Sequence, residues 1–340
     1  MTAPAEDFRV VAFGGGTGMA ALLAGLRRYT QDISAVVTVT DNGGSSGILR
    51  NDYDMVAPGD IRNCLIALAD ADPLFLESLR YRFEDGDFKG HCFGNLFITV
   101  LTRIVGSFEE SIRVMNRLLG VRGKVIPAAG GRISLVARHP DGTKSTGEVQ
   151  ISKSGKPIER VELRPGPVPI SDEIRAAVRE ADLFVVGPGS LFTSIIPNLI
   201  LVGLVEEIRR NGSPTVYVSN MMTQPGETDG FRLSDHIRAI RRHAGDAVPD
   251  WVIAQAASLP EAVVARYGAG RAVPVEIDIE GVPEFRGIRL IRGDFYGGGD
   301  VARHDPELLA RTICREFFPS GILRSERGGR GAEPARREAP

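Results

Sequence analysis

The feature that most constrains the fold is a strand–glycine loop–helix unit, which the sequence contains three times. In the first unit, the apolar run RVVAF (Arg9–Phe13) is followed at once by the loop GGGTG (Gly14–Gly18) and a helix-like segment. A second apolar strand, Ile33–Thr40, ends in the loop DNGGSSG (Asp41–Gly47), and a later strand ends in GPGS (Gly187–Ser190). Strands joined by crossover helices in this way predict a parallel sheet with right-handed connections.

The remaining sequence continues this α/β alternation around one interruption. Residues 58–119 show the i, i+3, i+4 spacing of apolar residues that is typical of helices. Residues 132–149 instead indicate a hairpin with Asp-Gly at its turn, so we expect a small β-rich insertion over about 124–169. We expect one α/β domain over residues 1–318, with a mostly parallel sheet and helices on both faces. Charge, Gly and Pro dominate residues 319–340, which predicts a disordered tail.

Composition narrows the classes of function. The chain has 340 residues and a formal net charge of −2, so no general positive charge indicates nucleic-acid binding. Its three cysteines lack CxxC spacing, which disfavours a disulfide framework or a structural zinc site. The N-terminus is short and acidic and does not resemble a signal peptide. The most apolar later run, residues 191–208, is broken by Pro197 and Asn198. We expect a soluble cytoplasmic protein without membrane insertion.

The three glycine-rich loops indicate a phosphate site. In an open parallel sheet, loops that follow the strands lie together at the carboxyl edge, where ligands bind. Glycines let backbone N–H groups approach an anion, and the next helix N-terminus adds partial positive charge. Gly43, Gly44 and Gly47 give the second loop its freedom, and Ser45 and Ser46 offer hydroxyls. One such loop can carry glycine for turn geometry alone, but three together favour a phosphate ligand.

The residues alone leave the identity of that ligand open. GGGTG is not a Walker A loop, because no Gly-Lys-Ser/Thr follows it. It can be aligned as GxGxxA through Gly16, Gly18 and Ala21, with Asp41 roughly where a dinucleotide fold places its ribose-binding acid. An NAD-dependent oxidoreductase is therefore one reading, although this motif is weak without its context and no hydride-transfer site follows downstream.

Two segments in which we expect a helix to begin contain further polar residues that could bind a ligand. Asp60 can cap a helix or lie near a cation, and Arg62 can bind a phosphate through two hydrogen bonds. His91 and Asn95 are one helical turn apart and can face one ligand. The alternatives are a cap beside an exposed arginine, and a structural histidine. Cys92 follows His91 directly, and neighbours on a helix do not face each other, so we do not expect a Cys–His nucleophile pair.

Seven segments carry a family resemblance. They occur in order at natural spacing and read GGGTG, DNGGSSG, PGDIRNCLIALAD, GHCFGNLF, VRGKVIPA, GPGSLFTSIIPNL and MTQPGETDG. Together they resemble the YvcK-type gluconeogenesis factor family, also called UPF0052, over about residues 9–317. That family is similar to the CofD-like 2-phospho-L-lactate transferases of deazaflavin coenzyme synthesis.

The resemblance implies a Rossmann-like α/β fold with a nucleotide site on the loops. CofD-like members bind a guanine nucleotide and a divalent ion, and they move a phospholactyl group from a guanosine diphosphate adduct to a deazaflavin. The YvcK-like branch is associated with binding UDP-sugars, notably UDP-N-acetylglucosamine. There, a tyrosine and an arginine hold the uridine nucleotide, and Tyr267 and Arg303 match those positions. An aromatic face can stack on a base, and a guanidinium can bind a diphosphate.

The loops and the resemblance together give one set of candidate nucleotide-binding residues. They are Gly14, Gly15, Gly16, Thr17, Gly18, Asp41, Asn42, Gly43, Gly44, Ser45, Ser46, Asp60, Arg62, Asn63, His91, Asn95, Gly187, Gly189, Ser190, Thr223, Gln224, Tyr267 and Arg303. Glu227 and Asp229, in the turn TQPGETDG, cap the next helix or lie near this site. Asp41 is the candidate ligand for Mg²⁺.

Three positions depart from the family pattern. Asn42 replaces the second acid of Asp-Asp-Gly-Gly-Ser-Ser-Gly, which removes negative charge beside Asp41 and weakens a divalent-ion site. Nucleotide binding is still expected, because the amide offers an oxygen. Cys92 replaces a serine, which is a small change. Ile48 stands where an arginine is common, so one possible phosphate contact is lost.

Two hypotheses follow. The first is a cytoplasmic UDP-sugar-binding regulator, without a required catalytic activity, that supports growth, cell-wall precursor supply and cell shape on gluconeogenic carbon sources. Its partners would be a protein of cell-wall synthesis and, potentially, further copies of itself. The alternative is a CofD-like transferase in which Asp41 and Mg²⁺ position the diphosphate and electrostatics stabilise the leaving nucleotide.

Overall fold

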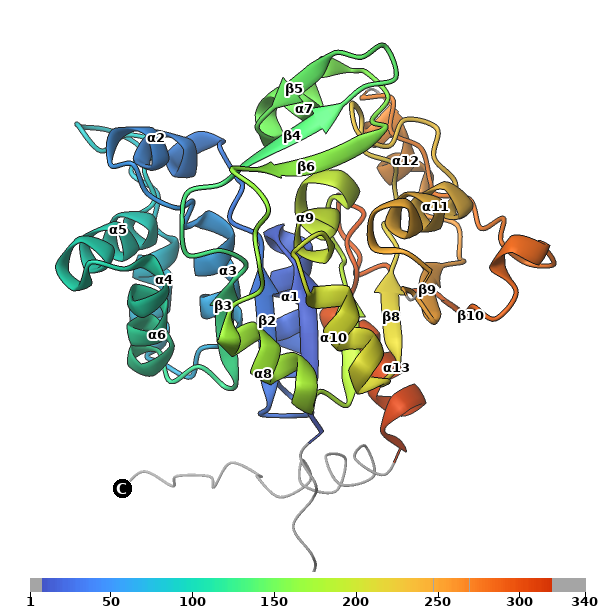
Figure 1. Cartoon of the computed structure of the whole chain (residues 1–340), viewed down its shortest axis with the longest axis horizontal. Helices are drawn as coiled ribbons and strands as arrows, with labels where there is room; N and C mark the ends of the chain where they lie inside the picture. The colour runs from blue at the N-terminus through green and yellow to red at the C-terminus, as the bar shows by residue number, and fades with distance from the viewer. Residues whose placement is uncertain (1–7, 247, 269, 320–340) are drawn as a thin grey trace, which may run out of the picture.

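A seven-stranded parallel sheet forms the centre of the molecule (Figure 1). The computed structural model describes residues 8–246, 248–268 and 270–319. The strand order is β10-β9-β8-β7-β1-β2-β3. These strands are β1 (Val10–Gly14), β2 (Ile33–Val37), β3 (Lys124–Pro127), β7 (Leu183–Val186), β8 (Thr215–Val218), β9 (Trp251–Gln255) and β10 (Arg289–Gly293). The chain leaves β1 for β2 and β3 on one side, then returns to β7 on the other, so a topological switch point lies between β1 and β7.

Helices cover both faces of this sheet, as the sequence predicts. On one face α1 (Gly16–Leu26) packs against α3 (Gly59–Leu68) and α13 (Pro306–Phe317). In front of the sheet in Figure 1 lie α8 (Asp172–Glu180), α9 (Ile196–Leu199) and α10 (Leu204–Asn211). Because the central strands are covered twice, β1, β2, β7 and β8 are buried along their whole length, which explains their continuous apolar runs.

The remaining helices lie at the two ends of the sheet (Figure 1). Beyond β3 lie α2 (Gly44–Asp52), α4 (Pro73–Arg80), α5 (Phe93–Val105) and α6 (Phe108–Leu118). Near β8 and β9 lie α11 (Leu233–Ala244) and α12 (Glu261–Gly268). A π-helical turn, Leu191–Ile195, precedes α9, and a 3-10 turn spans Pro283–Phe285. None of the helices within the described ranges combines the length and apolar character needed to span a bilayer.

A three-stranded antiparallel sheet sits above the carboxyl edge of the main sheet (Figure 1). It contains β4 (Ser134–Arg138), β5 (Lys144–Thr146) and β6 (Arg160–Arg164), with α7 (Glu148–Ser154) between β5 and β6. The hairpin with Asp-Gly near its turn is confirmed by the β4–β5 pairing. The predicted insertion boundary at residue 124 is wrong, because residues 124–127 pair in parallel with β2 and belong to the main sheet. The separate sheet is narrower, over residues 134–164.

The predicted loop Asp41–Gly47 is shorter than expected, because α2 already begins at Gly44. Gly47 is required there by close packing: a Cβ atom at this position would lie 2.2 Å from the carbonyl oxygen of Asn42. The three cysteines are buried and unbonded to one another. The predicted tail, residues 319–340, lies outside the described residues from position 320 onward.

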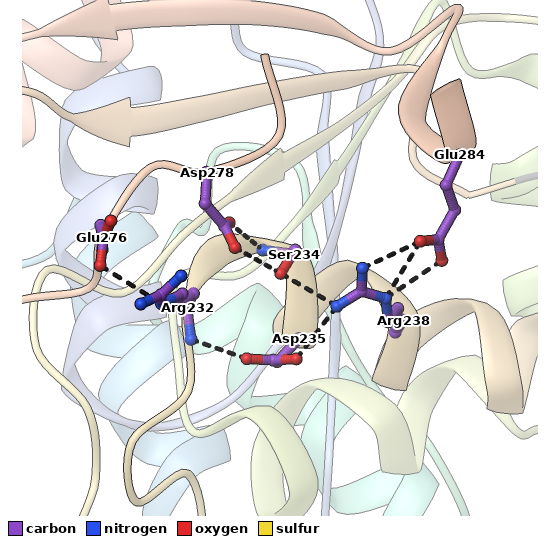
Figure 2. Close-up of polar contacts among 7 residues, drawn as sticks. All are labelled: Arg232, Ser234, Asp235, Arg238, Glu276, Asp278 and Glu284. Atoms are coloured by element: carbon purple, nitrogen blue, oxygen red, sulfur yellow. Dashed lines mark hydrogen bonds and ion pairs between the residues drawn. The ribbon is translucent and has the colours of Figure 1, made fainter. Parts of the chain in front are cut away.

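The segment that follows α12 is fastened to α11 by a polar network (Figure 2). Its contacts are Arg232–Glu276 at 3.3 Å, Ser234 Oγ donating to Asp278 at 2.7 Å, and Arg238–Glu284 at 2.9 Å. Asp278 also accepts from the backbone N–H of Ser234 in the first turn of α11, which satisfies one donor of that helix end. Exposed ion pairs add little stability singly, but together they fix the path of the chain between α12 and β10.

Candidate functional site

A cleft of about 470 Å³ lies at the carboxyl edge of the sheet, beside the switch point between β1 and β7. Loops from separate parts of the chain form its walls. They are Gly15–Gly18 after β1, Asp41 after β2, Asp60 in α3, Glu148 in α7, Pro188–Ser190 after β7, Asn220–Gln224 after β8, Tyr267 in α12 and Val301–His304 before α13. The position of this cleft is the one at which open α/β sheets bind ligands.

The floor is the loop after β1 and the N-terminus of α1. Gly15 is the N-cap residue of α1. Because glycine has no side chain, this residue cannot accept hydrogen bonds from the first backbone N–H groups of the helix. Gly16 has φ of +72°, a left-handed conformation that favours glycine. A Cβ atom at Gly18 would lie 3.1 Å from the carbonyl oxygen of Pro188, so the β1 and β7 loops approach closely. The arrangement suits an anion at the helix N-terminus.

Three carboxyl groups face this floor: Asp41, Asp60 and Glu148. Burial and the neighbouring charge of Asp41 raise the pKa of Asp60 to about 6, against the opposing effect of a hydrogen bond from the Gly16 backbone. Burial, followed by the charges of Asp41 and Asp60, raises the pKa of Glu148 to about 8. Ionisable groups with strongly shifted pKa values in a cleft are typical of functional sites.

A fourth acid, Glu227, lies behind the cleft. Burial raises its pKa, while hydrogen bonds from Ser152 and Thr193 oppose the shift. The Thr193 hydroxyl donates to Glu227 at 3.3 Å and is also a hydrogen-bond partner of Glu148. Thr193 belongs to the π-helical turn after β7, and such turns are frequent at functional sites. Glu227 is thus near the site, whereas the Asp229 carboxylate binds the backbone N–H of Gly226.

Polar side chains join the β7 and β8 loops. Gln224 Nε2 donates to Ser190 Oγ at 2.7 Å, and Asn220 Nδ2 donates to Gln224 Oε1 at 3.3 Å. Thr223 Oγ1 accepts from the backbone N–H of Val273 at 2.9 Å. The first contact joins the two loops, the second lies within the β8 loop, and the third ties that loop to the segment after α12.

Tyr267 and Arg303 line the same cleft, although 36 positions separate them in the chain. Within the described residues the Arg303 guanidinium makes no hydrogen bond or ion pair. His304 is next to it, and burial lowers the pKa of His304 to about 4, which keeps the ring neutral at pH 7. Its Nε2 atom is buried and has no hydrogen-bond partner among the described residues. The cleft therefore contains an unpaired cation next to a neutral imidazole ring.

A second group of the predicted residues forms a network outside the cleft lining. Ser45 Oγ lies 3.3 Å from His91 Nδ1 and accepts from Asn95 Nδ2 at 3.2 Å. Arg62 donates to Asn95 Oδ1 at 2.7 Å and to Asn63 Oδ1 at 2.8 Å. These side chains bond to one another and tie α2, α3 and α5 together, although the buried Nε atom of Arg62 has no hydrogen-bond partner among the described residues.

Asn42 faces the small sheet. Its Oδ1 atom accepts from the backbone N–H of Val149 at 3.0 Å, at the start of α7. Gly147 lies against the same side chain, since a Cβ atom there would be 2.2 Å from Asn42 Nδ2. The amide oxygen expected to face a ligand is therefore used to fasten α7.

The structure thus divides the predicted residues. Those that line the cleft are Gly15, Gly16, Thr17, Gly18, Asp41, Asp60, Gly189, Ser190, Thr223, Gln224, Tyr267 and Arg303. Those outside the lining are Gly14, Asn42, Gly43, Gly44, Ser45, Ser46, Arg62, Asn63, His91, Asn95 and Gly187. Sequence reasoning did not include several lining residues, namely Glu148, Ser194, Asn220, Met221, Met222, Val301, Ala302 and His304. His304 could have been predicted from the sequence, because it follows Arg303 directly.

Comparison with known proteins identifies the family of this chain. The sequence profile of the family described as 2-phospho-L-lactate transferase CofD matches residues 10–296. The chain belongs to the CofD family. This CofD-family chain is 42% identical over 306 residues to the gluconeogenesis factor of Halalkalibacterium halodurans, covering 89% of this chain and 95% of that protein. It is 41% identical over 307 residues to the gluconeogenesis factor of Bacillus subtilis, covering 90% of this chain and 96% of that one.

A solved structure supports the same placement within the CofD family. A member of the UPF0052 family from Bacillus halodurans superimposes with a TM-score of 0.88 at 42% identity, covering 90% of this chain and 99% of that one. The resemblance carried by the seven motifs and the Rossmann-like α/β fold are thereby confirmed. Family membership favours the two nucleotide hypotheses over the NAD reading, which rests on GxGxxA alone.

Proposed function

We propose that the cleft binds a UDP-sugar, with UDP-N-acetylglucosamine as the first candidate, and that the protein acts as a cytoplasmic regulator. The observation that carries the proposal is that the unpaired Arg303 guanidinium and the Tyr267 ring line the same cleft as the N-terminus of α1. A nucleotide diphosphate needs a cation and backbone donors, and a base needs a flat partner; this cleft supplies all three.

Each wall then has a role in holding the ligand. Arg303 and the first backbone N–H groups of α1 would bind the diphosphate, and Tyr267 would stack on the uracil. His304 lines the cleft next to Arg303, and its ring, which burial keeps neutral, would add no charge beside the diphosphate. Because two sheets contribute to the cleft, we treat residues 1–318 as one functional domain.

The regulatory part of the proposal follows from the relatives, which are named gluconeogenesis factors. The concentration of a UDP-sugar used in cell-wall synthesis would reflect the supply of cell-wall precursors during growth on gluconeogenic carbon sources. The bound protein would then act on a protein of cell-wall synthesis and so support growth and cell shape.

One observation favours the transferase alternative. The charge of Asp41 disfavours ionisation of the nearby Asp60, and a divalent cation between them would relieve this repulsion. These two carboxylates fit Mg²⁺, whereas Asn42 is held by Val149 and does not. Bound Mg²⁺ would neutralise a diphosphate during transfer from a guanosine diphosphate adduct to a deazaflavin. Among the described residues, no set of three or more His, Cys, Asp or Glu side chains is arranged so that it could hold a metal ion, so these two carboxylates would have to bind Mg²⁺ together with ligand oxygens.

Isothermal titration calorimetry distinguishes the two proposals. UDP-N-acetylglucosamine, GDP and NAD are each titrated into the protein, with and without Mg²⁺. We expect selective binding of the UDP-sugar, weakened by about 30-fold or more in Arg303→Ala, because a charge-assisted contact is lost. The exposed Arg292→Ala serves as the matched control and should bind as the wild type does. Absence of UDP-sugar binding would refute the proposal, and Mg²⁺-dependent GDP binding would favour the transferase.

A further inference from the structure

A second cavity, of about 620 Å³, lies between the small sheet and the helices in front of the main sheet. We call it the front cavity. Its lining comes from β6 and the segment after it (160–168), the end of α9 with the first part of α10 (199–209), and the end of α11 (243–245). In Figure 1, β6 lies above α9, and α10 and α11 lie below and beside that helix. Among the described residues, none lines both this cavity and the cleft. A cavity of this volume is typical of small-molecule sites.

Arginines outnumber acids in the lining of the front cavity. Its charged residues are Arg160, Arg164, Arg209, Glu162 and Glu206. Glu162 is already shared by Arg138 and Arg164, each of which has a nitrogen 2.9 Å from a carboxylate oxygen. Within the described residues, Arg160 and Arg209 form neither a hydrogen bond nor an ion pair. The front cavity therefore contains two guanidinium groups whose positive charge is not balanced by an ion pair.

Both free guanidinium groups lie near the carboxyl-terminal end of α11. A Cβ atom at Gly245, the C-cap of α11, would be 3.2 Å from Nη2 of Arg209. Arg160 belongs to a different wall: it directly precedes Val161, whose backbone N–H donates to Nε2 of His243 at 3.0 Å. Burial lowers the pKa of His243, and the charge of Arg160 is close enough to contribute to this shift. Arg160 and Arg209 thus approach the same short segment, 243–245, from two walls of the cavity.

These two cations lack an adequate negative partner within the chain. The end of α11 carries about half an elementary negative charge, which favours cations there but is less than the charge of two guanidinium groups. Glu206 precedes Arg209 by three residues on α10, and the two form no ion pair among the described residues. A phosphate group would supply about two negative charges, and its oxygens could accept paired hydrogen bonds from each guanidinium.

The rest of the front cavity suits the organic part of a phosphorylated molecule. Val168 and Val202 line it, and the side chain of Val202 is 51% exposed. At the start of α10, the N-cap Gly203 has no side chain, and the backbone N–H groups of Val205 and Glu206 have no acceptor among the described residues. Apolar surface and hydrogen-bond donors beside the arginines favour a phosphorylated organic molecule over a bare phosphate ion.

We propose that the front cavity binds a small organic phosphate, whose phosphate group lies between Arg160 and Arg209 and whose carbon skeleton contacts Val202. The proposal does not rest on which nucleotide the cleft binds, because the two sites share no lining residue. It makes the protein a receptor for two ligands, one at the carboxyl edge of the main sheet and one in front of that sheet.

Isothermal titration calorimetry of the full chain tests the proposal. Phenyl phosphate is the probe, because it joins one phosphate group to an apolar ring, and phenol is the matched control without phosphate. We expect phenyl phosphate to bind with a dissociation constant of about 1 mM or lower, inorganic phosphate to bind more weakly, and phenol not to bind.

Variants assign the binding to the front cavity. Arg160→Gln and Arg209→Gln should each weaken phenyl phosphate binding by about 10-fold or more, because a charge-assisted contact is lost. Both side chains are exposed and make no hydrogen bond, so circular dichroism should show that the variants fold as the wild type does. Arg315→Gln, which removes an exposed arginine of α13, is the control and should not change the binding.

A change at the acid of the lining should have the opposite sign. Glu206→Gln should strengthen phenyl phosphate binding by about threefold, because it removes a negative charge near the phosphate group. The proposal would be overturned if neither phenyl phosphate nor inorganic phosphate bound at about 20 mM. Binding that both Arg160→Gln and Arg209→Gln retain in full would also overturn it.

Hydrogen exchange locates the site independently of any variant. Amides in residues 160–168 and 199–209 should exchange more slowly when phenyl phosphate is present, because the ligand restricts opening of these segments. Protection confined to the cleft loops, residues 14–18 and 220–224, would place the phosphate group in the cleft and contradict the proposal.

Discussion

Replacing Glu148 by glutamine should stabilise the protein, and the gain should grow with pH. Glu148 lines the cleft with Asp41 and Asp60, whose charges oppose its ionisation. Glutamine keeps the size of the side chain and its ability to bond to Thr193, but it cannot ionise. The variant therefore removes the cost of ionising a carboxyl group that is desolvated by burial and that lies near the charges of Asp41 and Asp60.

The size of the effect follows from linkage between protonation and folding. Burial and neighbouring charge raise the pKa of Glu148 from 4.5 to about 8. Above pH 4.5 the unfolded chain releases this proton while the folded protein keeps it until about pH 8, so stability falls as pH rises through this window. At 1.36 kcal/mol for each unit of pKa, the ceiling is about 5 kcal/mol. Because the side chain is only half-buried and solvent screens its charge, we expect about 1–2 kcal/mol at pH 8.

Urea unfolding at pH 5 and pH 8 measures this effect. The free energies of unfolding of wild type and Glu148→Gln should agree closely at pH 5 and differ by about 1–2 kcal/mol at pH 8, with the variant more stable. Glu316→Gln, at an exposed position of α13, is the control and should show no such pH-dependent gain. Equal effects at both pH values, or a less stable variant at pH 8, would refute the reasoning.

Two further predictions concern packing and buried polar contacts. Gly25→Ala should lower the free energy of unfolding by about 3 kcal/mol, because its Cβ atom would lie 2.0 Å from the Pro306 carbonyl oxygen and force α1 away from α13. Gly268→Ala, where a Cβ atom meets no neighbour, should change it little in the same denaturant titration. Arg62→Ala should lower the free energy of unfolding by about 2 kcal/mol, because Asn95 is buried and would lose the donor at its Oδ1 atom. A melting temperature within about 1 °C of the wild type would contradict the importance of that contact.

Local pattern was enough to predict the parts of the fold that depend on neighbouring residues. The β1 strand, the glycine loop and α1 follow one another without interruption, so their geometry could be read directly. The same holds for the β4–β5 hairpin with its Asp-Gly pair. Lys124–Pro127 was assigned to the wrong sheet, because four residues do not reveal which distant strand they pair with.

The cleft could be predicted only in part, for the same reason. Loops after the parallel strands must meet at one edge, so Gly16, Asp41 and Gly189 were accessible to reasoning from sequence. Glu148 was not, because it enters from the small sheet, whose position over the cleft is a long-range property of the fold. His91 and Asn95 have the spacing of a ligand pair, yet their side chains bind Ser45 in a network outside the cleft lining.

The contact between Asn42 and the backbone of Val149 joins the small sheet to the main sheet through a neutral group. The protonation of Asp60 and Glu148 depends on pH and on neighbouring charges, whereas an amide does not ionise. An aspartate here could accept the same hydrogen bond, yet it would add a further negative charge near Glu148 and oppose the ionisation of that group more strongly. The hydrogen bond that holds α7 therefore does not depend on the protonation of the cleft acids. The small sheet can keep its position above the cleft when those acids gain or lose protons.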